Sequence, residues 1–153
     1  MIIRQMTIHD VPALTKLGEY FWFESAVCEC FGNKYPKEIV HRKLFNGIAS
    51  GEFISWGCED DGKIVSMIVL IKTKNLWTDE NQLAEILWYS CSDRRLGFSN
   101  IKLLMQVEKW AKQNNIDILI MGRIKGVPSY EKLPKFYKSL GYNQMEETFI
   151  KKL

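Results

Sequence analysis

The residues best suited to chemistry follow an apolar run over residues 83–91. The next turn holds Arg94, Arg95 and Gly97, and apolar periodicity predicts a helix over 98–114. The first N–H groups of a helix lack partners within it and lie at the positive end of its dipole, so they attract anions. Gly97 would let the backbone approach a phosphate closely, and arginine would add a charge-assisted contact. The pattern fits either an anion site or an ordinary strand-to-helix turn with solvated arginines.

A second candidate is Glu85, the only charged residue within the 83–91 run. A carboxylate in so apolar a strand is costly unless it lies at a cleft, pairs with a cation or is used in chemistry. Strict alternation along the strand would place it on the same face as Leu87 and Tyr89. Two interpretations stay open: a general base, or one half of a structural ion pair with a lysine or arginine.

The elements that must position these residues follow from periodicity and turn signals. Asp60-Asp61-Gly62 between two apolar runs predicts a tight hairpin, and Gly141 marks a helix end. The resulting order indicates an α+β, or mixed α/β, domain. In chain order we expect a strand over 2–8, helices over 11–28 and 36–49, strands over 53–59, 63–72 and 83–91, a helix over 98–114, a strand over 116–121, a helix over 133–140 and a terminal strand over 142–153.

Length and composition limit the class of protein. A chain of 153 residues, 46% hydrophobic and 25% charged, is expected to form one globular domain over 1–153. A net charge of +3 with mixed signs argues against nucleic acid or a membrane as the main partner. No apolar stretch approaches the ~20 residues of a membrane span, and no export signal is recognisable, so a cytoplasmic location is expected.

Cysteine and histidine spacing gives no metal centre. Cys28 and Cys30 are two apart, Cys58 and Cys91 are isolated, and no second pair or histidine cluster completes a zinc site. We therefore expect four reduced thiols and no metal. The oligomeric state is not set by the sequence, which is compatible with a homodimer.

Two motifs resemble those of one superfamily. Arg94-x-x-Gly97-x-Ser99 is similar to the Gln/Arg-x-x-Gly-x-Gly/Ala motif of the GNAT superfamily of acetyl-CoA-dependent N-acyltransferases. Tyr137-x-x-x-Gly141-Tyr142 resembles the Tyr-x-x-x-Gly-Phe/Tyr ending of the same superfamily, and the order of elements follows its pattern over nearly the whole chain. The chain looks most like the short, phage- and prophage-type members. The resemblance implies a GNAT-like acyltransferase fold with a central mixed, mostly antiparallel sheet flanked by helices.

The resemblance also assigns a binding site for acetyl-CoA. It implies that the strand edge near Tyr89 and Cys91 hydrogen-bonds the pantetheine arm. It implies too that backbone amides of the following turn bind the pyrophosphate, helped by the two arginine side chains. The residues of that turn are Arg94, Arg95, Leu96, Gly97, Phe98 and Ser99.

The catalytic roles carried over are those of an acid and a base. Tyr137 would face the thioester sulfur and protonate the departing thiolate, or it is simply a core aromatic. Glu85 is the best candidate to deprotonate the amine, ahead of His9 and His41. An acyl-enzyme on Cys91 is disfavoured because no His or Asp is placed to activate the thiol.

The expected activity is transfer of an acetyl group from acetyl-CoA to an amine of a small molecule or protein, by direct attack in a ternary complex. The alternative is a non-catalytic GNAT-like CoA-binding or regulatory module. The acceptor would lie between the first two helices and the last strands. The residues expected there are Trp22, Glu24, Cys28, Phe31, Tyr35 and the segment 145–149.

Overall fold

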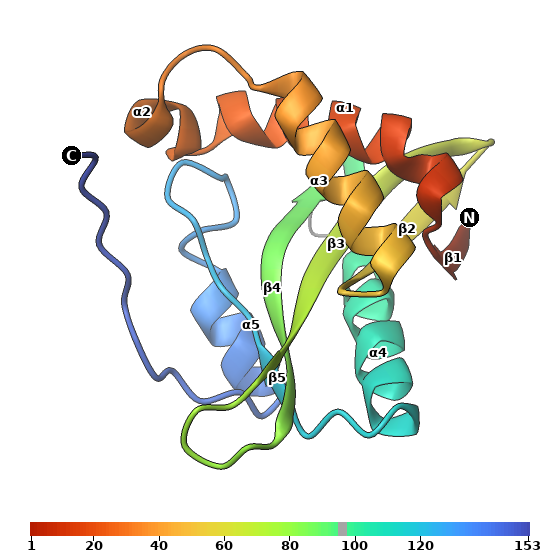
Figure 1. Ribbon diagram of the computed structural model, residues 1–153, viewed down its shortest axis with the longest axis vertical. Helices are drawn as coiled ribbons and strands as arrows, with labels where there is room; N and C mark the ends of the chain where they lie inside the picture. The colour runs from red at the N-terminus through yellow and green to blue at the C-terminus, as the bar shows by residue number, and fades with distance from the viewer. Residues whose placement is uncertain (95–97) are drawn as a thin grey trace.

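The computed structural model describes residues 1–94 and 98–153 and contains one five-stranded sheet in the order β1-β2-β3-β4-β5 (Figure 1). Strands β1 to β4 pair with one another in antiparallel fashion, and β5 is parallel to β4. The expected mixed, mostly antiparallel sheet is therefore confirmed. The strands are β1 (Ile2–Gln5), β2 (Phe53–Asp60), β3 (Lys63–Lys74), β4 (Asn81–Ser90) and β5 (Ile118–Ile120).

Helices cover both faces of the sheet. On one face, α1 (Val11–Glu24) packs against β3 and β4, and α3 (Lys37–Ser50) packs against α1 and β2. Leu14 and Leu44 are buried in the core on this face. On the other face, α4 (Phe98–Gln113) packs Leu103 and Val107 against β2, β3 and β4. The remaining short helices are α2 (Val27–Phe31), α5 (Leu133–Ser139) and the 3₁₀ turns η1 (Ile8–Asp10) and η2 (Ser92–Arg94). None of the helices described is long and apolar enough to cross a membrane.

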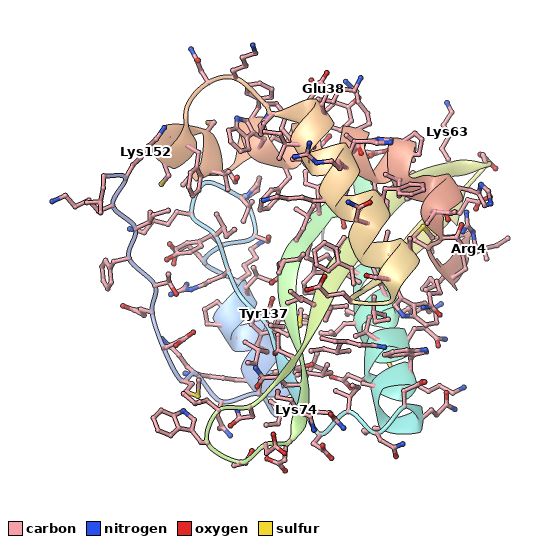
Figure 2. All side chains as sticks on the ribbon, viewed as in Figure 1. Arg4, Glu38, Lys63, Lys74, Tyr137 and Lys152 are labelled. Carbon is pink, nitrogen blue, oxygen red and sulfur yellow. The ribbon has the colours of Figure 1, made fainter. Side chains whose placement is uncertain are left out.

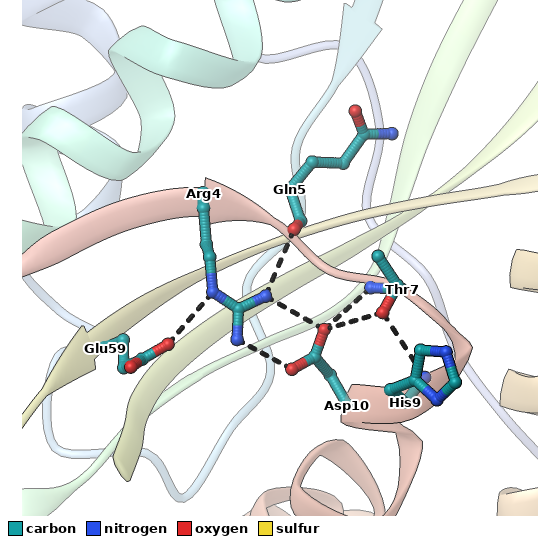
Figure 3. Close-up of polar contacts among 6 residues, drawn as sticks. All are labelled: Arg4, Gln5, Thr7, His9, Asp10 and Glu59. Carbon is teal, nitrogen blue, oxygen red and sulfur yellow. Dashed lines mark hydrogen bonds and ion pairs between the residues drawn. The ribbon is translucent and has the colours of Figure 1, made fainter. Parts of the chain in front are cut away.

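The first strand is shorter than expected because a capping box begins directly after it. Thr7 and Asp10 cap η1 reciprocally, so the strand ends at Gln5. Arg4 on β1 then fixes this junction: its guanidinium donates to both carboxylate oxygens of Asp10, at 2.8 and 3.0 Å, and to Glu59 on β2 at 2.9 Å (Figure 3). The Arg4 bonds lower the pKa of Asp10 to about 2.

The helix expected over 11–28 is wrong in its second half, because α1 ends at Glu24 and a separate α2 begins at Val27. Ser25 is extended, and the Ala26 N–H donates to the carbonyl of Lys125 at 2.7 Å instead of continuing the helix. A contact 99 residues away in sequence thus breaks a helix that the local periodicity would continue.

The terminal strand expected over 142–153 is also wrong. Residues 143–153 form neither helix nor strand, and Met145 and Phe149 are 80% and 90% exposed. The adjacent charges of Glu146 and Glu147 interrupt any alternating apolar face. The segment therefore has little apolar surface to bury against a sheet, and burial is what specifies strand register.

Two glycines with the same backbone conformation allow the contact between the α1–α2 junction and the loop after β5 to be tested. Gly126 and Gly141 both have φ of +90°. A Cβ at Gly126 would lie 2.9–3.1 Å from backbone atoms of Ser25 and Ala26, whereas one at Gly141 would meet nothing within 4 Å. Left-handed strain, about 1–2 kcal/mol for a non-glycine residue, is common to both positions.

We expect Gly141→Ala to cost only this strain. Gly126→Ala should cost about 2–4 kcal/mol, because the backbone at Ser25 must also move and the Ala26–Lys125 hydrogen bond is weakened. Urea unfolding of both variants gives the comparison. Equal losses would show that this contact contributes nothing to stability in solution.

Candidate active site

The site is built where β4 and β5 diverge. The two strands pair only from Gln82 to Ala84 on β4 and from Ile118 to Ile120 on β5, and beyond that point the sheet opens. A pocket of about 180 Å³ occupies the opening. It is lined by Phe21, Glu85, Trp88, Tyr89, Ser90, Asn100, Ile101, Gly122, Arg123, Ile124, Val127, Ser129, Lys132, Leu133, Phe136 and Tyr137.

The pocket reaches both faces of the sheet. Trp88 and Tyr89 are adjacent on β4 and therefore point to opposite faces. Tyr89 belongs to the core under α1, whereas Trp88 packs against the core under α4 and contacts Phe136 of α5. Because both line one pocket, the pocket passes through the sheet between the separating strands. A ligand lying in it could react with a second ligand arriving from the opposite face.

A bulge in β4 corrects the expected placement of Glu85. Opposite β3, Leu87 pairs with Val69 but Glu85 pairs with Leu70, so Ile86 is the extra residue. Paired residues share a face, and Val69 lies in the α1 core while Leu70 lies in the α4 core. Glu85 is therefore on the α4 face, opposite to Leu87 and Tyr89, because one inserted residue reverses the alternation.

This placement brings Glu85 and Tyr137 together on one residue. The Gly122 N–H donates to Glu85 Oε2 at 2.9 Å, and the Tyr137 hydroxyl donates to the Gly122 carbonyl at 2.8 Å. Gly122 lies two residues after β5 ends, where no strand pairing satisfies its backbone. In Figure 2 Tyr137 lies where α5 faces the strands. The two candidate catalytic side chains are thus hydrogen-bonded to the N–H and to the carbonyl of the same residue, Gly122.

The surroundings shift both side chains toward their protonated forms. Burial raises the pKa of Glu85 above its ordinary value, and the hydrogen bond from Gly122 only partly offsets this. Burial, and then the negative charge of Glu85, raise the pKa of Tyr137 far above its ordinary range. The phenol therefore keeps its proton at neutral pH, while Glu85 becomes a stronger base than an exposed glutamate.

The ion-pair interpretation of Glu85 finds no partner in the described residues, where no Lys or Arg nitrogen lies within 4.0 Å of its carboxylate. Arg123 lines the same pocket, but its guanidinium lies 4.2 Å from the ring centre of Tyr130 and donates to the Tyr130 carbonyl. Residues 1–94 and 98–153 contain no group of three His, Cys, Asp or Glu side chains that could hold a metal.

The strand edge assigned to pantetheine has a defined direction. The Cys91 N–H donates to Val65 on β3, and backbone groups of alternate residues point the same way, so Tyr89 and Cys91 turn their backbones toward β3. The backbones of Trp88 and Ser90 point instead into the opening beside β5. The side chain of Tyr89 lies under α1, where its hydroxyl donates to Glu24 at 2.9 Å and burial raises its pKa to about 12.

The predicted pyrophosphate turn falls mostly outside the described residues. Arg95, Leu96 and Gly97 are not described, and neither are the side chains of Arg94 and Phe98. What is described agrees with a strand-turn-helix unit: β4 ends at Ser90, η2 follows, and α4 begins at Phe98 with Ser99 buried.

The residues expected at the acceptor end do not all converge. Glu24 reaches the pocket wall through its bond to Tyr89. Trp22 instead packs against Phe31 and Tyr35, with its indole N–H donating to the carbonyl of Gly32. The exposed residues of segment 145–149 and Cys28 do not line the pocket.

Sequence reasoning missed Gly122, Asn100 and the loop from Arg123 to Ser129. A glycine just after a buried strand was the one local signal available for Gly122. The roles of the others depend on contacts between segments far apart in the chain.

Comparison with known proteins supports the fold. No protein-family model matches the sequence, and no curated protein is significantly similar to it. The structure, however, matches solved acetyltransferases, including a predicted acetyltransferase from Clostridium acetobutylicum crystallised with acetyl-CoA, at a TM-score of 0.77 and 16% identity over 99% of this chain and 95% of that one.

Two further matches have named acceptors. Ribosomal-protein-alanine N-acetyltransferase from Brucella melitensis biovar Abortus 2308 has a TM-score of 0.74 and 13% identity, covering 99% of this chain and 98% of that one. An aminoglycoside acetyltransferase from an uncultured soil metagenomic sample, in complex with sisomicin, has a TM-score of 0.75 and 13% identity, covering 99% and 95%. The chain therefore has the GNAT acetyltransferase fold expected from its two motifs.

The raised pKa of Glu85 predicts how Glu85→Gln changes stability with pH. Below the ordinary glutamate pKa of 4.5, both folded and unfolded wild type are protonated and the variant should match it. As pH rises, the unfolded state ionises first and wild type loses stability until the folded pKa is passed. The variant has no such loss, and its amide oxygen still accepts from Gly122.

We therefore expect Glu85→Gln to melt higher than wild type at neutral pH and equally at about pH 3.5, with roughly 2–4 °C gained per kcal/mol in a chain of this size. The exposed Glu147→Gln is the matched control and should show no such trend. A lower Tm for Glu85→Gln at neutral pH would indicate that the carboxylate has a stabilising cationic partner.

Proposed function

We propose that the protein is an N-acetyltransferase that moves an acetyl group from acetyl-CoA to an amine. The observation that carries this is the convergence of Glu85 and Tyr137 on Gly122, in a pocket that passes through the sheet. A base and an acid at one point, reachable from two faces, suit direct transfer between two bound substrates. The acetyltransferase fold agrees with this chemistry.

The start of α4 and the open strand edge support a position for the cofactor. We place the pyrophosphate at the turn 94–99, because the first N–H groups of a helix have no partners within it and α4 begins at Phe98. The pantetheine arm would then run along β4. It would hydrogen-bond the backbones of Trp88 and Ser90 in the way that a paired strand does, at the part of β4 that β5 no longer covers. Its thioester end would reach Glu85 and Tyr137. The crystallised Clostridium protein holds acetyl-CoA, which agrees with CoA as the donor.

The reaction balances with these two side chains. Glu85, directly or through a water, takes a proton from the ammonium form of the acceptor, which exposes the nitrogen lone pair. The nitrogen attacks the thioester carbonyl, a C–N bond forms, and the C–S bond breaks. The nitrogen, cationic after the attack, then loses its second proton to solvent. Tyr137 gives its phenolic proton to the departing thiolate and regains one from solvent, and Glu85 releases its proton to solvent, so the products are a neutral amide, CoA-SH and one proton.

The acceptor would enter from the α1 face, near Phe21 and the Tyr89–Glu24 pair. The structural neighbours include an enzyme named for a ribosomal protein and one named for aminoglycosides. Both a protein and a small molecule therefore stay candidates for the acceptor. The resemblance to short, phage- and prophage-type members stays a prediction. We expect the reacting group to be an amine, because a glutamate base can free its lone pair by removing a proton.

Kinetics of the acid variant test this mechanism. We expect Tyr137→Phe to lower kcat by about a hundred- to ten-thousandfold, with CoA affinity little changed, because the phenolic proton is needed only in the transition state. Tyr142→Phe is the matched control, since its hydroxyl bonds Glu108 outside the pocket. The assay is CoA-thiol release from acetyl-CoA with a panel of peptide and small-molecule amines. Wild type that binds CoA but acetylates none of them would favour a non-catalytic CoA-binding module.

The base is tested by pH. Glu85→Gln should lower turnover most at neutral pH and less as pH rises, because more of the amine is then already deprotonated. A loss that is constant across pH would argue against Glu85 as the base.

Binding of the cofactor is tested separately at the turn before α4. Gly97→Glu should abolish CoA binding measured by calorimetry, because it adds bulk and negative charge at the proposed pyrophosphate site. Gln113→Glu places the same charge on an exposed position at the other end of α4 and should have no effect. Unchanged affinity in Gly97→Glu would refute the cofactor assignment.

A further inference from the structure

Three polar side chains join β3, β4 and the first turn of α4 beside the pocket. The hydroxyls of Ser66 and Ser90 are 2.6 Å apart, and both contact Oδ1 of Asn100, at 3.0 and 2.6 Å. Ser66 is fully buried and Ser90 is 7% exposed. Buried hydroxyls need partners, and the Asn100 carbonyl oxygen supplies one.

These contacts fix the direction of the Asn100 side-chain amide. A separation of 2.6 Å is typical of an O–H···O bond and shorter than an N–H···O bond. The carbonyl end therefore faces the serines, and the NH₂ end faces away from them. Asn100 lines the pocket, and no acceptor within residues 1–94 and 98–153 contacts its Nδ2. The amide thus presents a fixed hydrogen-bond donor beside the pocket.

Asn100 lies between the two ends of the proposed CoA path. It directly follows the turn 94–99 proposed for the pyrophosphate, and its contact Ser90 is separated from Glu85 by five residues along β4. At about 3.3 Å per residue, that stretch of β4 spans roughly 16 Å. This length suits an extended chain with two amides, which is the chemical character of the pantetheine arm.

We propose that Asn100 Nδ2 donates a hydrogen bond to an amide carbonyl of the pantetheine arm. Ser66 and Ser90 are positioning residues, because they hold the amide with its NH₂ group toward the pocket. This assignment rests on the proposed use of CoA. It extends that proposal by naming a side chain that would bind the pantetheine arm of CoA and not its nucleotide part.

A purely structural role makes a different prediction for Asn100→Asp. Aspartate keeps an oxygen for both serines and is favoured near a helix N-terminus, so the fold should be at least as stable. It replaces the donor by an oxygen that cannot bond a carbonyl. If Asn100 served only the serines, CoA binding would not change.

The experiment compares two ligands by calorimetry: CoA and 3′-phospho-ADP, which carries the pyrophosphate but lacks the pantetheine arm. We expect Asn100→Asp to bind CoA about tenfold more weakly and 3′-phospho-ADP with nearly unchanged affinity. Asn100→Ser, which is neutral and whose shorter side chain does not reach the position of Nδ2, should show the same selective loss. Asn114→Asp, an exposed site after α4, is the matched control. Melting curves confirm that each variant is folded.

The alternatives give distinct results. Equal weakening of both ligands in Asn100→Asp, with none in Asn100→Ser, would mean charge repulsion at the phosphates and would overturn the proposal. Unchanged CoA affinity in both variants would overturn it too. If wild type bound neither ligand, the proposed function itself would fail, independently of Asn100.

Discussion

The separation of β4 from β5 after three paired residues is the constraint on which the site depends. Parting strands leave backbone donors and acceptors that must find other partners. At Gly122 those partners are Glu85 and Tyr137, each within 3 Å of a backbone group. The side chains that we propose for the chemistry therefore also satisfy the backbone at the opening through which the substrates would enter. At Gly122 the same two side chains serve both the stability of the fold and the proposed reaction.

The single-residue bulge at Ile86 determines which face of the sheet each side chain of β4 lies on. It puts Glu85 on the face where α5 supplies Tyr137, and it leaves Tyr89 on the face where α1 supplies Glu24. Without it, the proposed base and the proposed acid would lie on opposite faces, with the sheet between them. Bulges recur next to active sites because they redirect one side chain without disturbing the rest of the ladder.

Patterns within a few residues predicted most of the fold, and long-range contacts account for the failures. Asp61-Gly62 set the β2–β3 hairpin, and the apolar periodicity of α4 predicted its bounds to within one residue. The break in the helix at Ser25 depends on a hydrogen bond to Lys125, and the bulge at Ile86 depends on pairing with β3. Both features arise from contacts between distant segments, so the local sequence does not predict them. Glu85 and Tyr137 were predicted by residue type and motif. Gly122 and Asn100 were not, because their roles exist only once distant strands and helices meet.

The apolar pocket also bears on how an amine could be activated at neutral pH. An ammonium arriving beside the Glu85 carboxylate would form a pair of charges in a region where burial already raises the pKa of Glu85. Desolvation disfavours the charged form of both groups, raising the pKa of the acid and lowering that of the amine. Proton transfer then converts two desolvated ions into two neutral groups. The burial that makes the glutamate costly in the free protein would thus favour the reactive, neutral amine once the acceptor is bound.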